Sequence, residues 1–408
     1  MPEARPVPIA VTGIGAVSAL GWGVPALEAG LFEGRCGIRR ITRFDSRAHR
    51  TQLAGEVPCP PEELARDRSL RRLSLADRLA VAAAREAVAM AALSPAHLRR
   101  MGIACASSAA GLLEGERHFD LTRGGARGDL RLLISHHLGS PGSSVARALG
   151  AGGPLLSVSS ACASGALAIE NGCLSLREGE ADVFLAGGSD SLSEVVHAGF
   201  NSLRAVDHEP CRPFRAGRAG LTLGEGAGFL VLETLAHARE RGVKPLALLL
   251  GTGSSCDAHH MTAPHAEGRG AASALRAALA DAGIAAADVG HVNCHGTGTG
   301  LNDPAEWAAL REALGERARE IPASATKALV GHLLGAAGAL EAVATILCLQ
   351  RGLAHPIPLH GEVDARCPVD LVMGSPRPLR RGASALSLSL GFGGANAALV
   401  FAPPADAA

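Results

Sequence analysis

The sequence predicts an α/β protein built from two similar halves, with parallel sheets covered by helices. Strand-like and helix-like segments alternate along both parts of the chain, which is typical of parallel strands joined by helical crossovers. The 408 residues are too many for one simple core, and their 47% hydrophobic content is enough for a large one. Because the order of elements begins to repeat near Leu246, we expect one half at residues 1–250 and the other at residues 251–408.

In the first half, strand and helix signals alternate. Residues 75–93 have apolar side chains at helical spacing and are expected to form an amphipathic helix. Short apolar segments bounded by glycine are expected to be buried strands. The expected strands are residues 8–17, 101–105, 154–158, 181–188 and the end of 221–232, and the expected helices are residues 22–33, 75–93 and the stretch from the corner at Cys162 to about Arg177.

The second half has a similar order of elements, although its residues are only faintly similar to those of the first. Residues 333–351 form a long apolar segment that is expected to be a buried helix. Residues 383–390 and 396–401 are expected to form a hairpin around a glycine turn. The other expected elements are strands at residues 246–252, 289–294 and 321–323, and helices at residues 271–282 and 304–314.

Composition and charge exclude several classes of partner and location. The 39 basic and 39 acidic side chains give a net charge of zero, which argues against binding to nucleic acid. The ten cysteines have the spacing of neither a disulfide framework nor a zinc site, so we expect a reducing cytoplasm. The chain starts without a basic segment followed by an apolar one, and it has no apolar run of 18 residues. We therefore expect no signal peptide and no membrane span.

The first candidate for chemistry is Cys162, which lies at a corner between a short apolar strand and a buried helix. Free N–H groups at the start of that helix are expected to point at the sulfur, and the helix dipole favours a thiolate. In this setting the pKa of a cysteine, normally about 8.5, is expected to fall towards neutrality. Small residues on both sides of Cys162 leave room for a substrate. The alternative is a buried structural cysteine, and only residues further along the chain decide between the two.

Three further segments carry polar groups at the ends of expected elements. His295 follows an apolar strand in the loop 293–303, at the strand end where α/β sheets place their ligands. Lys327 and His332 come just before the buried helix, and the glycine turn 391–396 can aim backbone N–H groups inward. Each segment alone is typical of a solvated residue or an ordinary turn. Together with Cys162, at the ends of elements in two matching halves, they indicate one shared site.

Four motifs, in this order, resemble those of the elongating β-ketoacyl-acyl-carrier-protein synthases, members of the thiolase-like superfamily of condensing enzymes. They are SACASG around Cys162, NCHGTGTGLND around His295, KALVGHLLGAAGALE around His332, and GFGGAN around Phe392. The similarity covers nearly the whole chain. It implies an internally duplicated α/β/α/β/α layered fold, with the nucleophile in the first half and the two histidines in the second.

The same resemblance separates this chain from three related classes. Thiolases use a second cysteine late in the chain, and Cys348 and Cys367 lack the glycine-rich surroundings of that residue. Initiating condensing enzymes use a histidine and an asparagine instead of two histidines, and the inactive chain-length factors lack the cysteine. Because this chain has Cys162, His295 and His332, it is similar to an active elongating synthase. A degradative thiolase and an inactive partner subunit are disfavoured.

The resemblance also implies a role for each motif residue. Cys162 would take the acyl group, because a soft nucleophile suits a thioester, and the backbone N–H groups of Cys162 and Phe392 would form the oxyanion hole. His295 and His332 would stabilise the enolate left by malonyl decarboxylation. Lys327 completes the expected catalytic set. The expected supporting residues are Glu341 and Asp303, and the expected substrate contacts are Thr262, Thr297, Thr299, Phe392 as a gate, and Leu112 and Leu113 at the acyl pocket.

The implied reaction is a decarboxylative Claisen condensation of a cysteine-bound acyl group with malonyl-acyl-carrier protein. It requires no metal and no organic cofactor, because the phosphopantetheine arm arrives on the acyl carrier protein. We expect a homodimer, or a heterodimer with a chain-length factor as in type II polyketide or polyene systems. Fatty acid and polyketide branches share the motifs, so pathway and acyl length stay open. The chain departs from the family at Gly300, where proline is usual, and at Asp190, where glutamate is usual.

Overall fold

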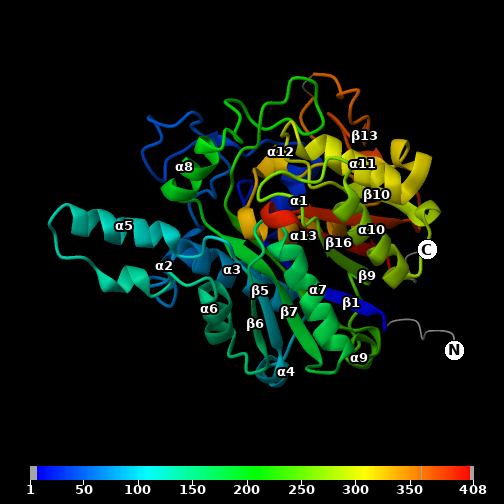
Figure 1. Cartoon of the computed structure of the whole chain (residues 1–408). Coiled ribbons are helices and arrows are strands. Elements are labelled where there is room, and N and C mark those ends of the chain that lie inside the picture. Colours follow the sequence, from blue (N-terminus) through cyan, green and yellow to red (C-terminus); the bar gives the residue numbers. More distant parts are fainter. Residues whose placement is uncertain (1–6, 360, 405–408) are drawn as a thin grey trace.

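The computed structural model describes residues 7–359 and 361–404. Helices and strands alternate along this part of the chain, and the strands of both halves form one large sheet (Figure 1).

The elements have the following bounds. The strands of the main sheet are β1 (Ile9–Ser18), β2 (Gly21–Trp22), β5 (Gly102–Ala106), β6 (Leu155–Val158), β7 (Val183–Asp190), β8 (Gly226–Thr234), β9 (Ala247–Cys256), β10 (Val289–Asn293), β11 (Pro322–Ser324), β13 (Asp370–Leu371), β15 (Ser384–Leu390) and β16 (Ala395–Ala402). Two short pairs are β3 (Arg39–Arg40) with β4 (Leu53–Ala54), and β12 (Leu353–Ala354) with β14 (Arg377–Pro378). The α-helices are α1 (Val24–Phe32), α2 (Glu62–Arg66), α3 (Leu75–Met90), α4 (Pro95–Arg100), α5 (Leu112–Arg123), α6 (Ser140–Leu149), α7 (Ser164–Arg177), α8 (Glu194–Ser202), α9 (Leu235–Glu240), α10 (Arg269–Ala282), α11 (Asn302–Leu314), α12 (Lys327–Val330) and α13 (Ala337–Arg351).

The sheet has the strand order β13-β11-β10-β15-β16-β9-β1-β8-β7-β5-β6, with β2 beside β1. Both halves have the same pattern of directions. Strands β6, β5 and β7 are parallel, as are β11, β10 and β15. The next strands, β8 and β1 in one half and β16 and β9 in the other, run antiparallel to their neighbours. The expected parallel pairing therefore holds for only part of each half, because β8 and β16 each run antiparallel to the strand before them. Strands β15 and β16 form the expected hairpin.

The two halves meet where β1 pairs with β9, through Ile9, Ala10 and Val11. The expected boundary at residue 250 lies inside β9, and the division into residues 1–250 and 251–408 stays a prediction.

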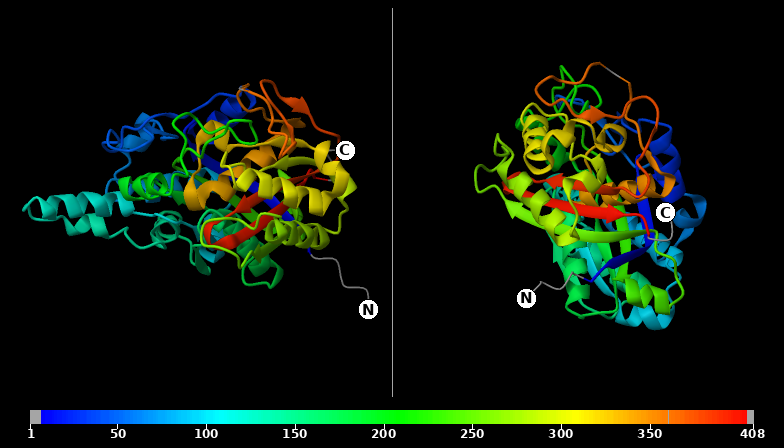
Figure 2. Two further views of the ribbon diagram at one scale, coloured as in Figure 1. Left: turned by 45° about the horizontal axis from the view of Figure 1, so that its top comes forward. Right: turned by 90° about the vertical axis from the view of Figure 1, so that its right-hand side faces the viewer.

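Helices form three layers around the two halves of the sheet (Figures 1 and 2). The middle layer is α7 and α13, which share one apolar core with strands of both halves. Helices α3 and α6 pack on the outer face of the first half. Helices α10 and α11 pack on the outer face of the second half. This is the expected α/β/α/β/α order.

The two middle helices cross at a pair of glycines. A Cβ atom on Gly165 would lie 2.6 Å from the backbone nitrogen of Ala339, and one on Gly338 would lie 2.9 Å from that of Ala166. Side-chain carbons do not approach backbone atoms so closely, so only glycine allows this packing. The crossing brings the start of α7, beside Cys162, next to the segment that follows His332.

One segment, Leu334–Arg351, is long and apolar enough to cross a membrane, with a mean hydropathy of 1.2. The sequence predicts no membrane span, because it has no uninterrupted apolar run of 18 residues. In the structure 83% of it is buried inside the protein, because it contains the middle-layer helix α13. A core helix that other elements cover on all sides can be as long and as apolar as a membrane-spanning helix, so length and composition do not distinguish the two.

The buried ring of His291 in β10 predicts a measurable dependence of stability on pH. Its Nε2 lies 3.1 Å from the Ser324 hydroxyl, and burial lowers the pKa of His291 to about 3 from 6.5. The unfolded chain takes up a proton below pH 6.5 and the folded protein does not, so this residue costs stability as the pH falls towards 3. In the variant His291→Leu, the free energy of unfolding should fall less steeply between pH 6 and 4, by up to about 1.4 kcal/mol per pH unit.

Urea unfolding at several pH values checks this expectation. The variant His208→Leu, which removes an exposed histidine, is the matched control. Loss of the Ser324 contact lowers stability equally at every pH, so only the slope is informative. Equal slopes for His291→Leu and the unmodified chain would contradict the prediction.

Candidate active site

Cys162 lies at the expected corner between β6 and α7 and is 7% exposed. The Ser164 hydroxyl donates to the Ala161 carbonyl over 2.6 Å and accepts from the Ser160 N–H over 2.7 Å, which closes the corner. Helix α7 begins at Ser164, so its first turn follows directly after the sulfur. The backbone N–H of Phe392, from the glycine turn 391–396, donates to the sulfur.

The thiol of Cys162 is less acidic than the sequence predicts. Burial raises the pKa of Cys162 to about 11 and outweighs the opposing effects of the Lys327 ammonium and the Phe392 N–H. The expected pKa near neutrality is therefore wrong. The small residues of the corner let neighbouring elements close over the sulfur and exclude water, and burial disfavours the charged form. At neutral pH this cysteine is a protonated thiol.

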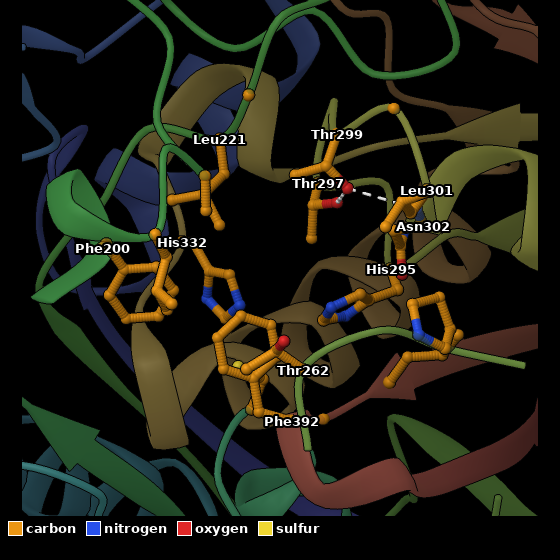
Figure 3. Close-up of a pocket in the computed structure, with 18 of the residues that line it drawn as sticks. Phe200, Leu221, Thr262, His295, Thr297, Thr299, Leu301, Asn302, His332 and Phe392 are labelled. Atoms are coloured by element: carbon orange, nitrogen blue, oxygen red, sulfur yellow. Dashed lines mark hydrogen bonds between the residues drawn. The ribbon is translucent and has the colours of Figure 1, made fainter. Parts of the chain in front are cut away.

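His295 and His332 face each other across the cavity beside Cys162 (Figure 3). Their ring centroids are 5.4 Å apart and their planes are nearly perpendicular, at 85°. The Leu334 N–H donates to Nδ1 of His332 over 3.1 Å, and the Lys327 ammonium lies 3.1 Å from Nδ1 of His295. Because each Nδ1 accepts a hydrogen bond, each neutral ring carries its proton on Nε2.

Both histidines stay neutral at physiological pH. Burial lowers the pKa of His295 and of His332 well below 6.5, and the positive charge of Lys327 acts in the same direction on both rings. For His295, the neighbouring His332 adds to this lowering of the pKa. The site therefore holds two uncharged N–H donors.

Lys327 begins α12 and is almost fully buried. Its ammonium donates to the His295 carbonyl over 2.6 Å, to Nδ1 of His295, and to Oε1 of Glu341 in α13. Burial raises the pKa of Glu341 to about 7, although the Lys327 charge opposes this rise. The structure thus brings together Lys327, Glu341 and His295, as expected from the motifs.

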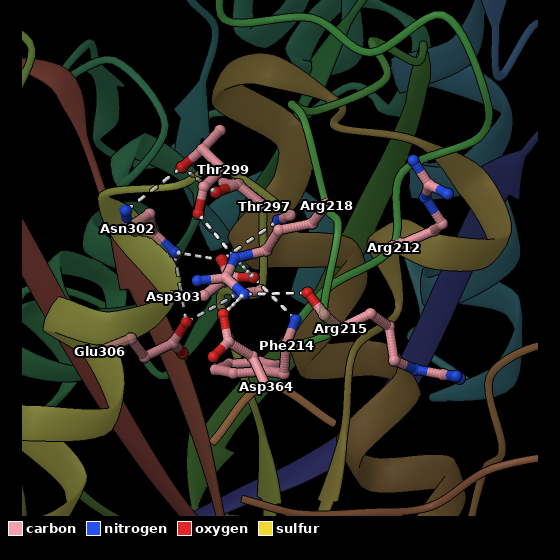
Figure 4. A network of polar contacts seen from close by, with 12 residues as sticks. Arg212, Phe214, Arg215, Arg218, Thr297, Thr299, Asn302, Asp303, Glu306 and Asp364 are labelled. Atoms are coloured by element: carbon pink, nitrogen blue, oxygen red, sulfur yellow. Dashed lines mark hydrogen bonds and ion pairs between the residues drawn. The ribbon is translucent and has the colours of Figure 1, made fainter. Parts of the chain in front are cut away.

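The loop that carries His295 is held by two carboxylates of α11 (Figure 4). Glu306 accepts from the N–H of His295 over 2.6 Å and from that of Gly296 over 2.8 Å. Asp303 accepts from the N–H of Gly298 over 3.1 Å and from that of Phe214 over 2.7 Å. Asp303 thus lies where the sequence analysis expected a bracing residue, and Glu306 was missed.

Arg218 is the second residue that the sequence analysis missed. It is buried, forms ion pairs with Asp303 at 3.3 Å and with Asp364 at 2.6 Å, and donates to the Thr299 carbonyl over 3.1 Å. The spacing of Asp303 and Glu306, one helical turn apart directly after the histidine loop, could have revealed Glu306. Arg218 lies far from the loop in sequence, so only the fold brings it there.

Cys162, His295 and His332 line one cavity of about 260 Å³. Figure 3 shows the two histidines in its wall. Thr262, Thr297 and Thr299 line it too, as expected for substrate contacts. The other walls are apolar or come from loops. The main additional lining residues are Phe200, Leu203, Arg204, Leu221, Leu301, Asn302, Leu390 and Phe392.

Phe392 stacks on Phe200, a residue of α8, with ring centroids 5.6 Å apart and an angle of 20°. Leu112 and Leu113, the expected acyl-pocket residues, do not line the cavity. Leu113 is buried in the core beneath α3, and half-buried Leu112 packs in the apolar cluster that contains Leu221. Both residues belong to the first turn of α5, and their side chains pack against its neighbours.

Two family models together match most of the chain. The β-ketoacyl synthase N-terminal domain matches residues 7–238, and the β-ketoacyl synthase C-terminal domain matches residues 246–360. The chain belongs to the β-ketoacyl synthase family. The four motifs, with Cys162, His295, His332 and Phe392 around one cavity, are therefore those of a β-ketoacyl synthase.

Relatives of this β-ketoacyl synthase cover its full length. Nodulation protein E of Rhizobium meliloti (strain 1021) is 36% identical, over 96% of this chain and 98% of its own. The 3-oxoacyl-[acyl-carrier-protein] synthase 2 of Staphylococcus aureus (strain COL) is 35% identical, over 96% of this chain and 97% of its own. The predicted elongating class is thereby confirmed.

Solved ketosynthase structures have the same fold. The ishigamide ketosynthase/chain length factor superposes with a TM-score of 0.91 at 34% identity, over 98% of this chain and 100% of that chain. AntDE:AntF, a type II PKS acyl-carrier protein in complex with its ketosynthase, gives 0.89 at 30% identity, over 98% and 100%. The predicted thiolase-like fold is confirmed.

The buried thiol of this β-ketoacyl synthase predicts an order of cysteine reactivity. At pH 7, iodoacetamide should modify exposed Cys59 and Cys256 before Cys162, because Cys162 is buried and its pKa is raised to about 11. Between pH 7 and 10 the labelling rate of Cys162 should rise roughly tenfold per pH unit, following its thiolate fraction. Peptide mapping by mass spectrometry measures each site.

The variant Lys327→Met should slow the labelling of Cys162 further, because it removes the positive charge that favours the thiolate. The variant Lys244→Met, at an exposed position, is the matched control. Rapid labelling of Cys162 at pH 7, ahead of both exposed cysteines, would show that the thiol pKa is not raised.

Proposed function

We propose that this chain extends an acyl chain by decarboxylative Claisen condensation with malonyl-acyl-carrier protein, through a covalent acyl group on Cys162. The observation that carries the proposal is the arrangement of two neutral histidines around the cysteine. Both rings are buried, both carry their proton on Nε2, and both line the cavity that holds the Cys162 sulfur. A nucleophile beside two uncharged donors suits a reaction that forms first an acyl-enzyme and then an enolate.

In the first half-reaction, the sulfur of Cys162 attacks the thioester carbonyl of the incoming acyl group. The backbone N–H groups of Cys162 and Phe392 stabilise the negative oxygen of the tetrahedral intermediate. The bond to the pantetheine sulfur then breaks, and the acyl group stays on Cys162. The proton of the Cys162 thiol passes to the departing pantetheine sulfur, so the transfer needs no net proton. With a thiol pKa of about 11, this proton is still on Cys162 when the substrate arrives.

In the second half-reaction, the malonyl thioester enters the same cavity. Its carboxylate leaves as carbon dioxide, and the electron pair of the broken bond forms an enolate whose oxygen accepts from Nε2–H of His295 and His332. The enolate carbon attacks the acyl carbonyl, a carbon–carbon bond forms, and the bond to Cys162 breaks. The departing Cys162 thiolate takes up one proton from water and becomes the resting thiol. Neutral rings serve this step because imidazolium ions would hold the malonyl carboxylate as an ion pair.

The buried charged side chains around His295 hold its ring and its loop in position. Lys327 holds the proton of His295 on Nε2 by occupying Nδ1, and Glu341 compensates the lysine charge. Glu306 and Asp303 fix the His295 loop through its backbone. Thr262, Thr297 and Thr299 provide hydroxyl groups along the cavity for the amides of a pantetheine arm. Phe392, stacked on Phe200, would move to admit the second substrate.

The substrates arrive on an acyl carrier protein, as in the AntDE:AntF complex, and the pantetheine arm belongs to that carrier. No step above uses a metal or an organic cofactor. Among the residues that the structure describes, no group of three His, Cys, Asp or Glu side chains could hold a metal ion. All ten cysteines are free, which suits a reducing compartment, so we place the reaction in the cytoplasm.

A second subunit of the same fold is the partner that best suits the exposed apolar surface. Helix α5 and the short helix Leu130–Leu133 form an arm that extends from the body (Figures 1 and 2). Its large apolar side chains are uncovered: Phe119 is 61% exposed, Leu130 73% and Ile134 63%. Several exposed large apolar side chains on one projecting arm are typical of a protein interface. The partner is a second copy or, as in the ishigamide ketosynthase/chain length factor, a chain-length factor of a type II polyketide system.

The two half-reactions can be tested separately. The variant Cys162→Ala should lose acyl-enzyme formation and condensation, yet still release carbon dioxide from malonyl-acyl-carrier protein, because both histidines remain. The variant His295→Ala should still be acylated, but its carbon dioxide release should fall by about 10²–10³ because one enolate donor is lost. Mass spectrometry measures the acyl-enzyme, and radiolabelled carbon dioxide measures decarboxylation.

Cys173→Ala, at a buried cysteine of α7 outside the cavity, is the matched control for the nucleophile. His237→Ala, at a histidine outside the cavity, is the control for the enolate donor. Decarboxylation at the unmodified rate by His295→Ala, combined with loss of acylation, would reverse the proposed roles.

The proposed pairing predicts that the arm controls the oligomeric state. The double variant Leu130→Glu with Ile134→Glu should elute as a monomer at micromolar concentration, because buried charges in an interface are costly. The unmodified chain, alone or co-expressed with a chain-length factor, should elute as a dimer. Size-exclusion chromatography with light scattering gives the mass. Leu359→Glu, at an exposed leucine outside the arm, is the control; a dimer that survives both arm substitutions would refute the assignment.

A further inference from the structure

A fully buried carboxylate, that of Asp190, lies behind the active-site cavity and has no part in the steps above. It ends β7, and among the described residues no basic side chain forms an ion pair with it. It receives hydrogen bonds from the Ser107 hydroxyl (2.6 Å) and from the backbone N–H groups of Ser108 (2.9 Å), Ala109 (2.8 Å), Ala110 (3.0 Å) and Gly335 (2.7 Å). Backbone N–H groups can only donate, so the ionised form of the carboxylate fits this site.

The donors to Asp190 come from both halves of the chain. The turn 107–111 follows β5 in the first half, whereas Gly335 follows His332 in the second. The contact is tight, because a Cβ atom on Gly335 would lie 2.6 Å from the Ser108 hydroxyl and 2.8 Å from Oδ2 of Asp190. One carboxylate therefore joins two turns that are distant in sequence and adjacent in the fold.

Three strained residues surround this carboxylate. Ala110 (φ 43°), Leu334 (φ 52°) and Ala161 (φ 46°) all have the left-handed backbone conformation that side chains other than glycine rarely adopt. Such conformations persist only where the surroundings hold them in place. The N–H of Ala110 donates to Asp190, and Leu334 directly precedes the donor Gly335.

Two of the three strained residues, Leu334 and Ala161, connect the carboxylate to a reactive group. The N–H of Leu334 donates to Nδ1 of His332 over 3.1 Å. The N–H of the next residue, Gly335, donates to Asp190, so the carboxylate holds the turn that orients this histidine. The Ser108 hydroxyl donates to the carbonyl of Ala161 over 3.1 Å, and Ala161 precedes Cys162. Two short chains of hydrogen bonds therefore connect the carboxylate to the site. One reaches His332 through the turn 334–335, and the other reaches the residue before Cys162 through Ser108.

We propose that Asp190 is a positioning residue that sets the Cys162 corner and His332 at their working separation across the two halves. The inference rests on the proposed function for the roles of those two side chains. Fixed geometry matters here because the same cysteine must face a thioester carbonyl and then an enolate held by the histidines. A displacement of about 1 Å at such a site can cost roughly a hundredfold in rate.

The near-isosteric variant Asp190→Asn tests the proposal. Its amide turns one acceptor into a donor that opposes the N–H groups of the two turns. Condensation and malonyl decarboxylation should both fall by roughly tenfold to a hundredfold. Removing the negative charge should also move the pH profile of Cys162 alkylation to lower pH, since Asp190 contributes to the raised pKa of that thiol. Asp190→Glu keeps the carboxylate, which is the family's usual group, and should recover most of the activity.

The matched control is Asp77→Asn. Asp77 is also fully buried and accepts from the Ser135 and Ser140 hydroxyls, but it lies in α3 away from the cavity. It should lower thermal stability without moving the alkylation profile. If Asp190→Asn behaves like Asp77→Asn, with unmodified decarboxylation and an unmoved profile, the residue is structural and the proposal is overturned.

A second variant covers the case in which Asp190→Asn does not fold. Ser108→Ala keeps the carboxylate and its backbone donors but removes the link to Ala161. It should slow the acylation of Cys162 several-fold while carbon dioxide release stays near the unmodified rate, and unchanged acylation would overturn the proposal. If the unmodified enzyme neither forms an acyl-enzyme nor releases carbon dioxide, the proposed function fails, and the alkylation profiles still decide the role of Asp190.

Discussion

The positive charge of Lys327, buried between His295 and Glu341, is the interaction on which the rest of the site depends. A buried ammonium group needs a carboxylate, and removal of either partner of such a pair typically costs about 3–5 kcal/mol. The charge fixes the ring proton of His295 on Nε2, lowers the pKa of both histidines and opposes the rise in the pKa of Cys162. Burial is the main reason that both bases stay neutral, and this one cation adds to that effect while it favours the ionisation of an acid.

Each histidine is anchored by a different carboxylate that accepts from the backbone. Glu306 holds the N–H groups of His295 and Gly296, and Asp190 holds the turn that follows His332 through Gly335. Burial raises the pKa of both carboxyl groups, that of Glu306 to about 8. The fold thus positions the two proposed enolate donors by the same physical means, in two different loops.

The sequence was most informative where chemistry dictates residue type. Cys162, the two histidines, Lys327 and the glycine turn could be predicted because each follows or precedes a recognisable element. The cavity walls could not, since Phe200 and Leu221 belong to no motif and reach the site only through tertiary packing. The acidity of Cys162 was misjudged because local sequence indicates a helix start but not how completely other elements exclude water. Leu112 and Leu113 lie outside the cavity because they begin α5 and pack among its neighbours, which local sequence does not indicate.

The position of α13 has a consequence for how the molecule can be divided. This helix belongs to the second half of the chain, yet its apolar sides are covered by strands and a helix of the first. A fragment that ends near residue 250 would leave an empty apolar groove, and the complementary fragment would expose a segment as apolar as a membrane span. The two halves share one apolar core around this helix, so we expect them to unfold together rather than as independent domains.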